Sequence, residues 1–224
     1  MAEPYFRASL FSFLRDLKRH NNREWFAANK ARYIEHVEAP MLRFIAAVGE
    51  RLPAISGAYV ADPRRSGGSL YRIYRDTRFS ADKTPYKTHT AAHFRHRAAS
   101  KTQETPGFYL HLSPNENFVG GGIYHPEMPT LTRIRQRIVA EPREWARVRK
   151  AVEVIEGDRL TRPPAGFDPA HKFVEDLKQK DFYAGSEFSV KDVTSKDFLN
   201  RYMEACAEVA PLMEFLTKSL GLRW

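Results

Sequence analysis

The residues best suited to binding chemistry lie close together between Arg64 and Lys101. This stretch holds ten lysines and arginines against two acids, Asp76 and Asp82, so its formal charge is 10 − 2 = +8, while the whole 224-residue chain carries +9. A surface that serves only solubility mixes its signs, so a segment that holds almost the entire excess indicates an anionic partner. We expect a phosphate-containing ligand, a nucleotide or nucleic acid. The alternative is a solvated basic face without a specific partner.

The strand pattern predicts that several of these cations meet at one site. Residues 70–76 alternate as a strand does, and a loop of about ten residues joins them to a strand that begins near Thr88, so the two should be antiparallel neighbours. A run of three glycines ends a later strand just before a helix, where free N–H groups favour an anion. The predicted anion-binding residues are Arg72, Arg75, Arg78, Lys83, Lys87, Gly120, Gly121 and Gly122.

Some of these residues also have purely structural interpretations. Asp76 is suited to be an ion-pair partner that holds Arg75 or Arg78 in place. The three glycines could instead let a neighbouring aromatic ring, such as that of Tyr71 or Tyr74, lie flat on the sheet. The glycine run matches neither a P-loop nor a dinucleotide-binding fingerprint.

The sequence contains no recognisable metal site or catalytic motif. His89 and His93 share a strand face but are separated by roughly 13 Å, too far for one ion. The single cysteine, Cys206, recurs at helical spacing with apolar residues and is expected to be a buried thiol. We predict no metal and no cofactor. If the protein is an enzyme, His93 or His111 is the candidate acid or base beside an arginine-held anion.

Three classes of function therefore remain open. The first is a module that binds nucleic acid or a phosphorylated ligand through the basic segment and its interleaved aromatics. The second is an enzyme that acts on a small phosphorylated or carboxylated substrate in an arginine-lined pocket. The third is an interaction domain for an acidic protein partner. An extended flat basic surface would favour the first or third class, and a pocket would favour the second.

The hydrophobic pattern predicts a single α+β domain that spans residues 1–224. Apolar residues recur at helical spacing from Leu10 to Leu52, with Asn21 or Asn22 as a cap and Pro40 as a break or kink. Residues 68–124 have the composition of an antiparallel β meander, and residues 181–190 that of one further strand. Two helices that begin with proline follow the meander, and residues 195–220 close the chain as one or two helices interrupted at Pro211.

Several blocks of the sequence resemble a known family. They are FLRDLKRHNNREWFAANKARY, YRIYRDTRFSADKTPYKTHTAAHF, GFYLHLSPNENFVGGGIYHPEMPTLTRIRQRI, LKQKDFY and PLMEFL, in this order from about Leu10 to Leu220. They look like the proteins grouped as domain of unknown function 2461. The resemblance implies a single soluble α+β domain and supplies no activity, cofactor or catalytic residue.

The composition also bears on where the protein is found. With 42% hydrophobic residues the chain is long enough to bury a core, so disorder is excluded as a class. No apolar run approaches the roughly 20 residues needed to cross a bilayer, and the first 20 residues carry charges where a signal peptide stays apolar. We expect a cytoplasmic protein without membrane association, and the sequence leaves its oligomeric state open.

Overall fold

The computed structural model describes residues 3–100, 103–152 and 154–224. The helices and strands are α1 (Ala8–Arg19), α2 (Arg23–Ala28), α3 (Lys30–Tyr33), a π-turn (Ile34–Glu38), α4 (Ala39–Arg51), a 3₁₀ turn (Leu52–Ala54), β1 (Tyr59–Val60), β2 (Thr90–His96), β3 (Gly107–Leu112), β4 (Asn117–Ile123), α5 (Met128–Ala140), α6 (Pro142–Ala151), α7 (Val174–Leu177), β5 (Phe182–Glu187), α8 (Val190–Val193) and α9 (Phe198–Ser219). This confirms the predicted α+β class.

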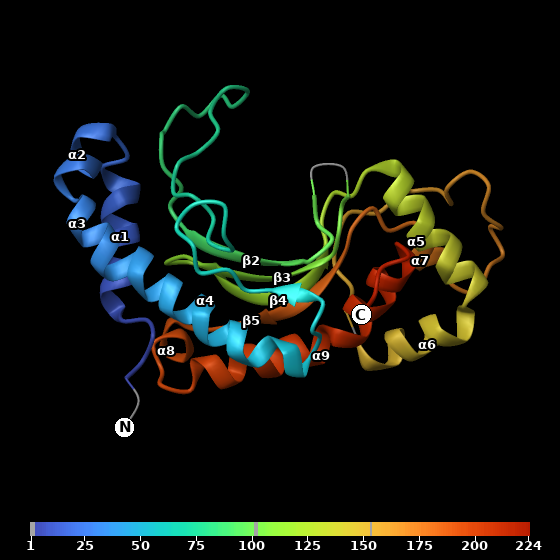
Figure 1. Ribbon diagram of the computed structural model, residues 1–224. Helices are drawn as coiled ribbons and strands as arrows, with labels where there is room; N and C mark the ends of the chain where they lie inside the picture. The colour runs from blue at the N-terminus through green and yellow to red at the C-terminus, as the bar shows by residue number, and fades with distance from the viewer. Residues whose placement is uncertain (1–2, 101–102, 153) are drawn as a thin grey trace.

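The centre of the fold is one antiparallel sheet of five strands in the order β1-β2-β3-β4-β5. The sheet is strongly curved, and α9 crosses beneath its convex face while the concave face opens upward (Figure 1). Strand residues alternate between these faces. Val119 and Ile123 of β4 are buried on the side of α9, where the Sδ of Met213 lies 2.8 Å from the position that a Cβ on Gly121 would take.

The N-terminal helices form a wall at one end of the sheet (Figure 1). The apolar side chains that recur at helical spacing in the sequence are buried in the core, as predicted. They include Leu10, Leu14 and Leu17 of α1. Asn22 caps α2 by accepting a hydrogen bond from the Trp25 backbone N–H at 2.8 Å. The predicted irregularity at Pro40 is present as the π-turn directly before α4, because proline has no N–H to donate to the preceding turn.

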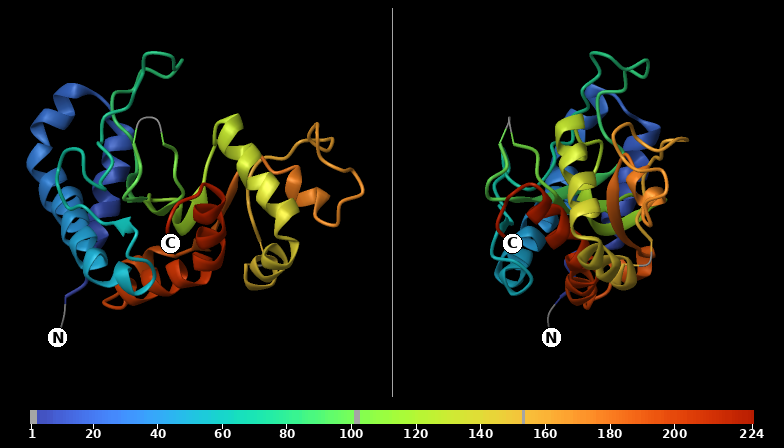
Figure 2. Two further views of the ribbon diagram at one scale, coloured as in Figure 1. Left: turned by 45° about the vertical axis from the view of Figure 1, so that its right-hand side comes forward. Right: turned by 90° about the vertical axis from the view of Figure 1, so that its right-hand side faces the viewer.

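Residues 71–89 differ from the prediction, because they form no regular strand. We name them the 71–89 loop, which rises beyond the edge of the sheet (Figures 1 and 2). Its two arms meet through one bridge, Tyr74 with Tyr86, and through the bond from the Lys87 N–H to the Ile73 carbonyl. Charged or polar side chains on both faces of residues 71–76 leave too little apolar surface to be covered by a sheet on either side.

The C-terminal helix is also more regular than predicted. Helix α9 continues from Phe198 to Ser219 through Pro211 without interruption. Proline removes one helical hydrogen bond, but the apolar residues before and after it, Val209 and Leu212, are buried in the core. Tertiary contacts on both sides of the proline therefore hold the helix together. None of the described helices combines the length and apolar character needed to span a membrane.

Asn21 connects the 71–89 loop to the N-terminal helices. Its side-chain amide donates to the Tyr86 carbonyl at 2.9 Å, and its carbonyl accepts from the Tyr86 N–H at 3.0 Å. The Tyr86 ring also stacks on Phe26, with 4.1 Å between ring centroids. The base of the loop is therefore fixed by Asn21 as a neighbouring strand would fix it.

The substitution Asn21→Ala should lower the free energy of unfolding by about 2 kcal/mol, because both backbone groups of Tyr86 lose their partner. Urea denaturation with a fluorescence or circular dichroism readout measures this change. Asn115→Ala is the matched control, because Asn115 is exposed, and it should change stability by less than about 0.5 kcal/mol. Equal effects of the two substitutions would mean that Asn21 does not anchor the loop.

Candidate functional site

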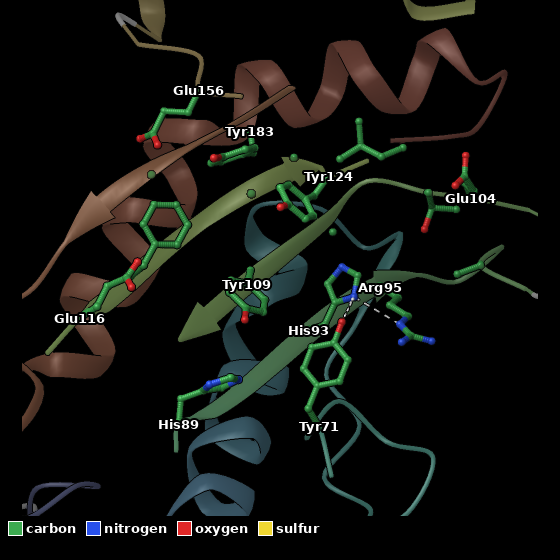
Figure 3. Close-up of a pocket in the computed structure, with 18 of the residues that line it drawn as sticks. Tyr71, His89, His93, Arg95, Glu104, Tyr109, Glu116, Tyr124, Glu156 and Tyr183 are labelled. Carbon is green, nitrogen blue, oxygen red and sulfur yellow. Dashed lines mark hydrogen bonds between the residues drawn. The ribbon is translucent and has the colours of Figure 1, made fainter. Parts of the chain in front are cut away.

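The concave face of the sheet forms a cavity of about 780 Å³. The strand register places three rows of residues across this face. The first row is Ala91, His111, Phe118 and Glu187; the second is His93, Tyr109, Gly120 and Gly185; the third is Arg95, Gly107, Gly122 and Tyr183. The 71–89 loop adds Tyr71, Lys87 and His89, and the segment after β4 adds Tyr124. Figure 3 shows Tyr71, His89 and Tyr124 around the hollow. The cavity is thus built mainly from alternate residues of four strands.

Four glycines on this face, Gly107, Gly120, Gly122 and Gly185, make up what we term the glycine floor. They form two cross-strand pairs, Gly107 with Gly122 and Gly120 with Gly185. A Cβ on Gly107 would overlap the ring of His93. One on Gly120 or Gly185 would lie 2.7 or 2.5 Å from Cζ of Phe118. Glycine therefore lets two rings lie flat on the sheet, as one interpretation of the glycine run expects, although the rings are His93 and Phe118.

The cations of the cavity are Lys87 and Arg95. Lys87 Nζ lies 5.0 Å from the centroid of the Tyr71 ring, and the Nε of Arg95 donates to His93 Nδ1 at 3.3 Å. Within the described part of the chain neither cation has a carboxylate within ion-pair distance. Burial and the nearby charge of Arg72 lower the pKa of Lys87. The β2 side of the cavity therefore carries two cations that no described acid balances.

The hydrogen bonds of His93 determine which of its two ring nitrogens carries the proton. An arginine can only donate, so Nδ1 of His93 must accept from Arg95, and the ring proton is on Nε2. The Tyr71 hydroxyl lies 3.3 Å from the same Nδ1 (Figure 3). Burial, followed by the charge of Arg95, lowers the pKa of His93 to about 4. His93 thus presents a neutral imidazole with an N–H donor above Gly107.

Two further histidines, His89 and His111, lie beside each other near the start of β2. The rings of His89 and His111 are 4.5 Å apart between centroids. Burial, followed by the charges of His111 and Lys87, lowers the pKa of His89 to about 4. Burial also lowers the pKa of His111. Across the described ranges no group of three histidine, cysteine or acidic side chains is placed to hold a metal ion.

Acidic side chains are spread around the rest of the cavity. Glu104, Glu116, Glu156 and Glu187 all contribute to its lining. Figure 3 shows Glu104, Glu116 and Glu156 on separate sides of the hollow, apart from His93 and Arg95. With the histidines neutral, the lining carries two formal positive charges and four negative ones. It is therefore a bipolar cavity and not a uniformly basic one.

The structure brings together only part of the predicted anion site. Lys87, Gly121 and Gly122 line the cavity, Gly120 is part of the glycine floor, and Arg72 lies close enough to Lys87 to affect its pKa. The other three predicted residues are engaged within the 71–89 loop. Arg75 binds Asp82 and Thr84, Arg78 binds Asp76 at 2.7 Å, and Lys83 donates to the Thr77 carbonyl at 3.0 Å.

Several residues that line the cavity are not among the predicted site residues. Arg95 belongs to the basic segment but not to the predicted anion site, and Tyr109, Tyr124, Tyr183 and the glutamates carry no signal in the sequence that marks them as site residues. The period-two pattern does place His93 with Arg95, and Gly120 with Gly122, on the same face of a strand. The register that joins these pairs across the strands is a tertiary feature that no single segment encodes.

A second hollow, of about 440 Å³, lies between the end of α1 and the β3–β4 turn. It is lined by Arg15, Lys18, Arg19, Thr88, Ser113, Pro114 and Asn115. The Ser113 hydroxyl is already used within its own turn, where it accepts from the Glu116 N–H at 2.9 Å. The hollow has cations but no aromatic or histidine side chain, so it offers less to a ligand than the concave face does.

We predict that His89 and His93 are neutral at pH 6 and that His93 carries its proton on Nε2. Their pKa values fall from 6.5 to about 4 on folding, so between these values the unfolded chain binds protons that the folded protein does not. The free energy of unfolding should therefore decrease as the pH is lowered from 6.5 towards 4. Nitrogen-15 NMR of the imidazole rings measures both the titration and the tautomer.

Arg95→Met provides the control for this prediction. It removes the donor to Nδ1 and the nearby positive charge, so the pKa of His93 should rise while that of His89 changes little. A His93 ring that is protonated at pH 6, or that carries its proton on Nδ1 in the unsubstituted protein, would contradict the assignment.

Comparison with known proteins supports the resemblance seen in the sequence. A family model described as a conserved hypothetical protein, domain of unknown function 2461, matches residues 9–215. Among curated proteins no match is found. The matched range contains every strand of the sheet and all residues that line the concave cavity. The chain therefore belongs to the domain of unknown function 2461 family.

Proposed function

We propose that the protein binds a small molecule that carries a phosphate or carboxylate group, and that it does so in the concave cavity. The observation that carries this proposal is that Lys87 and Arg95 both line the cavity, while neither forms an ion pair with a described residue. Each cation lacks an acidic partner among the described residues, and an anionic group of a ligand that contacts one of them would supply it.

The groups around these cations suit an anionic ligand. His93 offers its Nε2–H, and the Tyr71 hydroxyl lies beside His93 Nδ1. The Nε2–H is a neutral donor that does not add to the charge repulsion, whereas the Tyr71 hydroxyl donates its own proton to Nδ1. Charge-assisted hydrogen bonds from Lys and Arg to a phosphate or carboxylate are about twice as strong as neutral ones. The cations therefore supply affinity, and the neutral imidazole supplies orientation.

The cavity favours a small ligand over nucleic acid. A polyanion needs an extended row of unpaired cations to replace its counterions. Here the four glutamates outnumber the two cations of the lining, and Arg75 and Arg78 on the 71–89 loop already pair with Asp82 and Asp76. A ligand with a single anionic group can be accommodated at the Lys87 and Arg95 end, whereas a long polyanion would meet the carboxylates.

Several groups near the cations have shifted pKa values, which is typical of sites where chemistry takes place. The pKa values of Lys87, His89 and His93 are lowered, and burial, then Tyr71 and Glu116, raise the pKa of Tyr109 to about 12. This concentration in one cavity favours the enzyme class, in which the anionic molecule is a substrate. The neutral imidazoles are the groups best placed to take part in proton transfer.

The proposal predicts that Lys87→Met and Arg95→Met each weaken the binding of a simple phosphate monoester, phenyl phosphate, by roughly 10-fold to 100-fold. The reason is that each substitution removes a charged hydrogen bond to the anion, which is worth about 1.5–3 kcal/mol. Isothermal titration calorimetry at fixed ionic strength measures the affinities.

Arg78→Met is the matched control, because Arg78 is an arginine of the same basic segment that does not line the cavity. It should leave the affinity for phenyl phosphate unchanged. Equal losses in all three variants would indicate general charge effects and overturn the proposal. Tight, salt-sensitive binding of single-stranded DNA that depends on Arg78 and Lys83 would instead support the nucleic-acid class.

A further inference from the structure

The side of the cavity opposite its cations indicates what else the ligand carries. Resting on the proposed function, we infer that the ligand is a polyhydroxylated ring with a single anionic group, as in a sugar phosphate, a sugar acid or a nucleoside monophosphate. The inference is drawn from three glutamates in the lining, Glu116, Glu156 and Glu187.

Each of these glutamates is held on an ordered backbone. Glu187 is the last residue of β5 and pairs with Phe118. The Glu156 N–H donates to the Tyr183 carbonyl at 2.7 Å, and the Glu116 N–H donates to the Ser113 hydroxyl at 2.9 Å. The sheet and its turns therefore fix the backbone from which each of these exposed side chains extends.

The three carboxylates have no cationic partner among the residues that the structure describes. Glu104 is different, because it accepts a hydrogen bond from the Glu127 N–H at 3.0 Å. An ionised carboxylate can only accept hydrogen bonds, so a ligand that contacts these side chains must supply donors there. Hydroxyl and amino groups are the two common classes of donor.

The spacing of the carboxylates favours hydroxyl groups over an amine. Glu116 and Glu187 lie at the same end of β4 and β5, because Glu187 pairs with Phe118 and Glu116 precedes it by two residues. Glu156 lies at the other end of β5, where it bridges Tyr183. An ammonium group is a single compact donor, and its ideal site gathers acids around one point. Acids spread along the cavity instead match several separated donors on one ring.

Aromatic side chains supply surfaces for the apolar face of such a ring. Tyr124 and Tyr183 approach each other with 5.8 Å between ring centroids, and Tyr124 is 67% exposed towards solvent. The rings of His93 and Phe118 lie flat over the glycine floor, so a ligand ring would pack on these two side chains. The cavity thus offers cations to the anionic group of the ligand, carboxylates to its hydroxyl groups and aromatic side chains to its ring.

The test compares three phosphate monoesters that share the anion but differ in the attached group. Phenyl phosphate has a ring without hydroxyl groups, ribose 5-phosphate has a ring with hydroxyl groups, and O-phosphoethanolamine has an amine. We expect the affinity for ribose 5-phosphate to exceed that for phenyl phosphate by about tenfold or more. Adenosine 5′-monophosphate forms a fourth arm, and its affinity relative to ribose 5-phosphate tells a nucleotide ligand from a sugar phosphate.

Substitution of the carboxylates should weaken the binding of ribose 5-phosphate but not the binding of phenyl phosphate. Glu156→Gln and Glu187→Gln should each weaken ribose 5-phosphate about fivefold, because a charged acceptor for a hydroxyl is lost. The same changes should leave phenyl phosphate unchanged or make it bind more tightly, because negative charge near the anion is removed. Glu208→Gln, an equal change of charge at an exposed position of α9 outside the cavity, should affect neither.

The results separate this inference from the proposed function. If no monoester binds, the proposed function fails and the inference fails with it. If phenyl phosphate binds as tightly as ribose 5-phosphate in a manner that depends on Lys87 and Arg95, the anion site stands and the polyhydroxylated ligand is wrong. Tightest binding of O-phosphoethanolamine, weakened by Glu156→Gln or Glu187→Gln, would likewise overturn the inference in favour of an amine.

Discussion

The concave cavity depends on the strand register that pairs Gly107 with Gly122 and Gly120 with Gly185. With side chains at these positions, the rings of His93 and Phe118 would have to stand up from the sheet and would fill the hollow. Gly122 has a further constraint, because its φ of +151° is rarely adopted by other residues, and a Cβ there would overlap Tyr183. The same glycines that weaken the strands thus create the space for a ligand.

The register also decides which charges meet across the sheet. It places Arg95 beside Gly107, so the guanidinium can reach His93 on its own strand, and it places Glu187 beside Phe118 on the far strand. Positive charge is therefore concentrated at the side of β2, while carboxylates border the side of β5. This separation of charge would orient a ligand that has an anionic group at one end and hydrogen-bond donors at the other.

The basic segment has two structural roles that its composition does not distinguish. On the outer part of the 71–89 loop, Arg75 and Arg78 bind the only two acids of the segment. The bond from Arg78 lowers the pKa of Asp76 to about 2, and the Thr84 N–H, followed by Arg75, lowers the pKa of Asp82 to about 2. Further along the chain, Lys87 and Arg95 line the cavity, and neither has an acidic partner among the residues that the structure describes. The acids of the segment thus pair with arginines of the loop, and of the segment's described cations only two, Lys87 and Arg95, line the cavity.

Much of the fold follows from local sequence patterns. The helical spacing of α1, the proline starts of α5 and α6, and the strand composition of β2 to β5 all predict the elements that form. Two local predictions failed because tertiary contacts decided them. Residues 71–76 alternate like a strand, but they meet β2 and residues 85–87 only through isolated antiparallel bridges and not as a regular ladder. Helix α9 continues through Pro211 because the residues on both sides of the proline are buried.

The candidate site was harder to predict than the fold. The predicted anion site requires the arginines of residues 72–78 to face Lys87. This arrangement would form only if the two segments were a regular pair of strands. The observed partner of Lys87 on the cavity wall is Tyr71, and His93 and Arg95 of β2 line the same cavity. Finding them requires the pairing of β2 with β3 and of β3 with β4, and sequence periodicity gives the face of each strand but not its register.

The most direct test of this account is an amide NMR titration of the nitrogen-15-labelled protein with phenyl phosphate. The account predicts that the backbone resonances of Gly107 and Gly122, beside Arg95, shift with the ligand. The resonances of Gly57, Gly166 and Gly221, which lie outside the cavity lining, should stay in place. Shifts that are confined to Arg15, Lys18 and Arg19 around the smaller hollow, with the glycine floor unaffected, would contradict it.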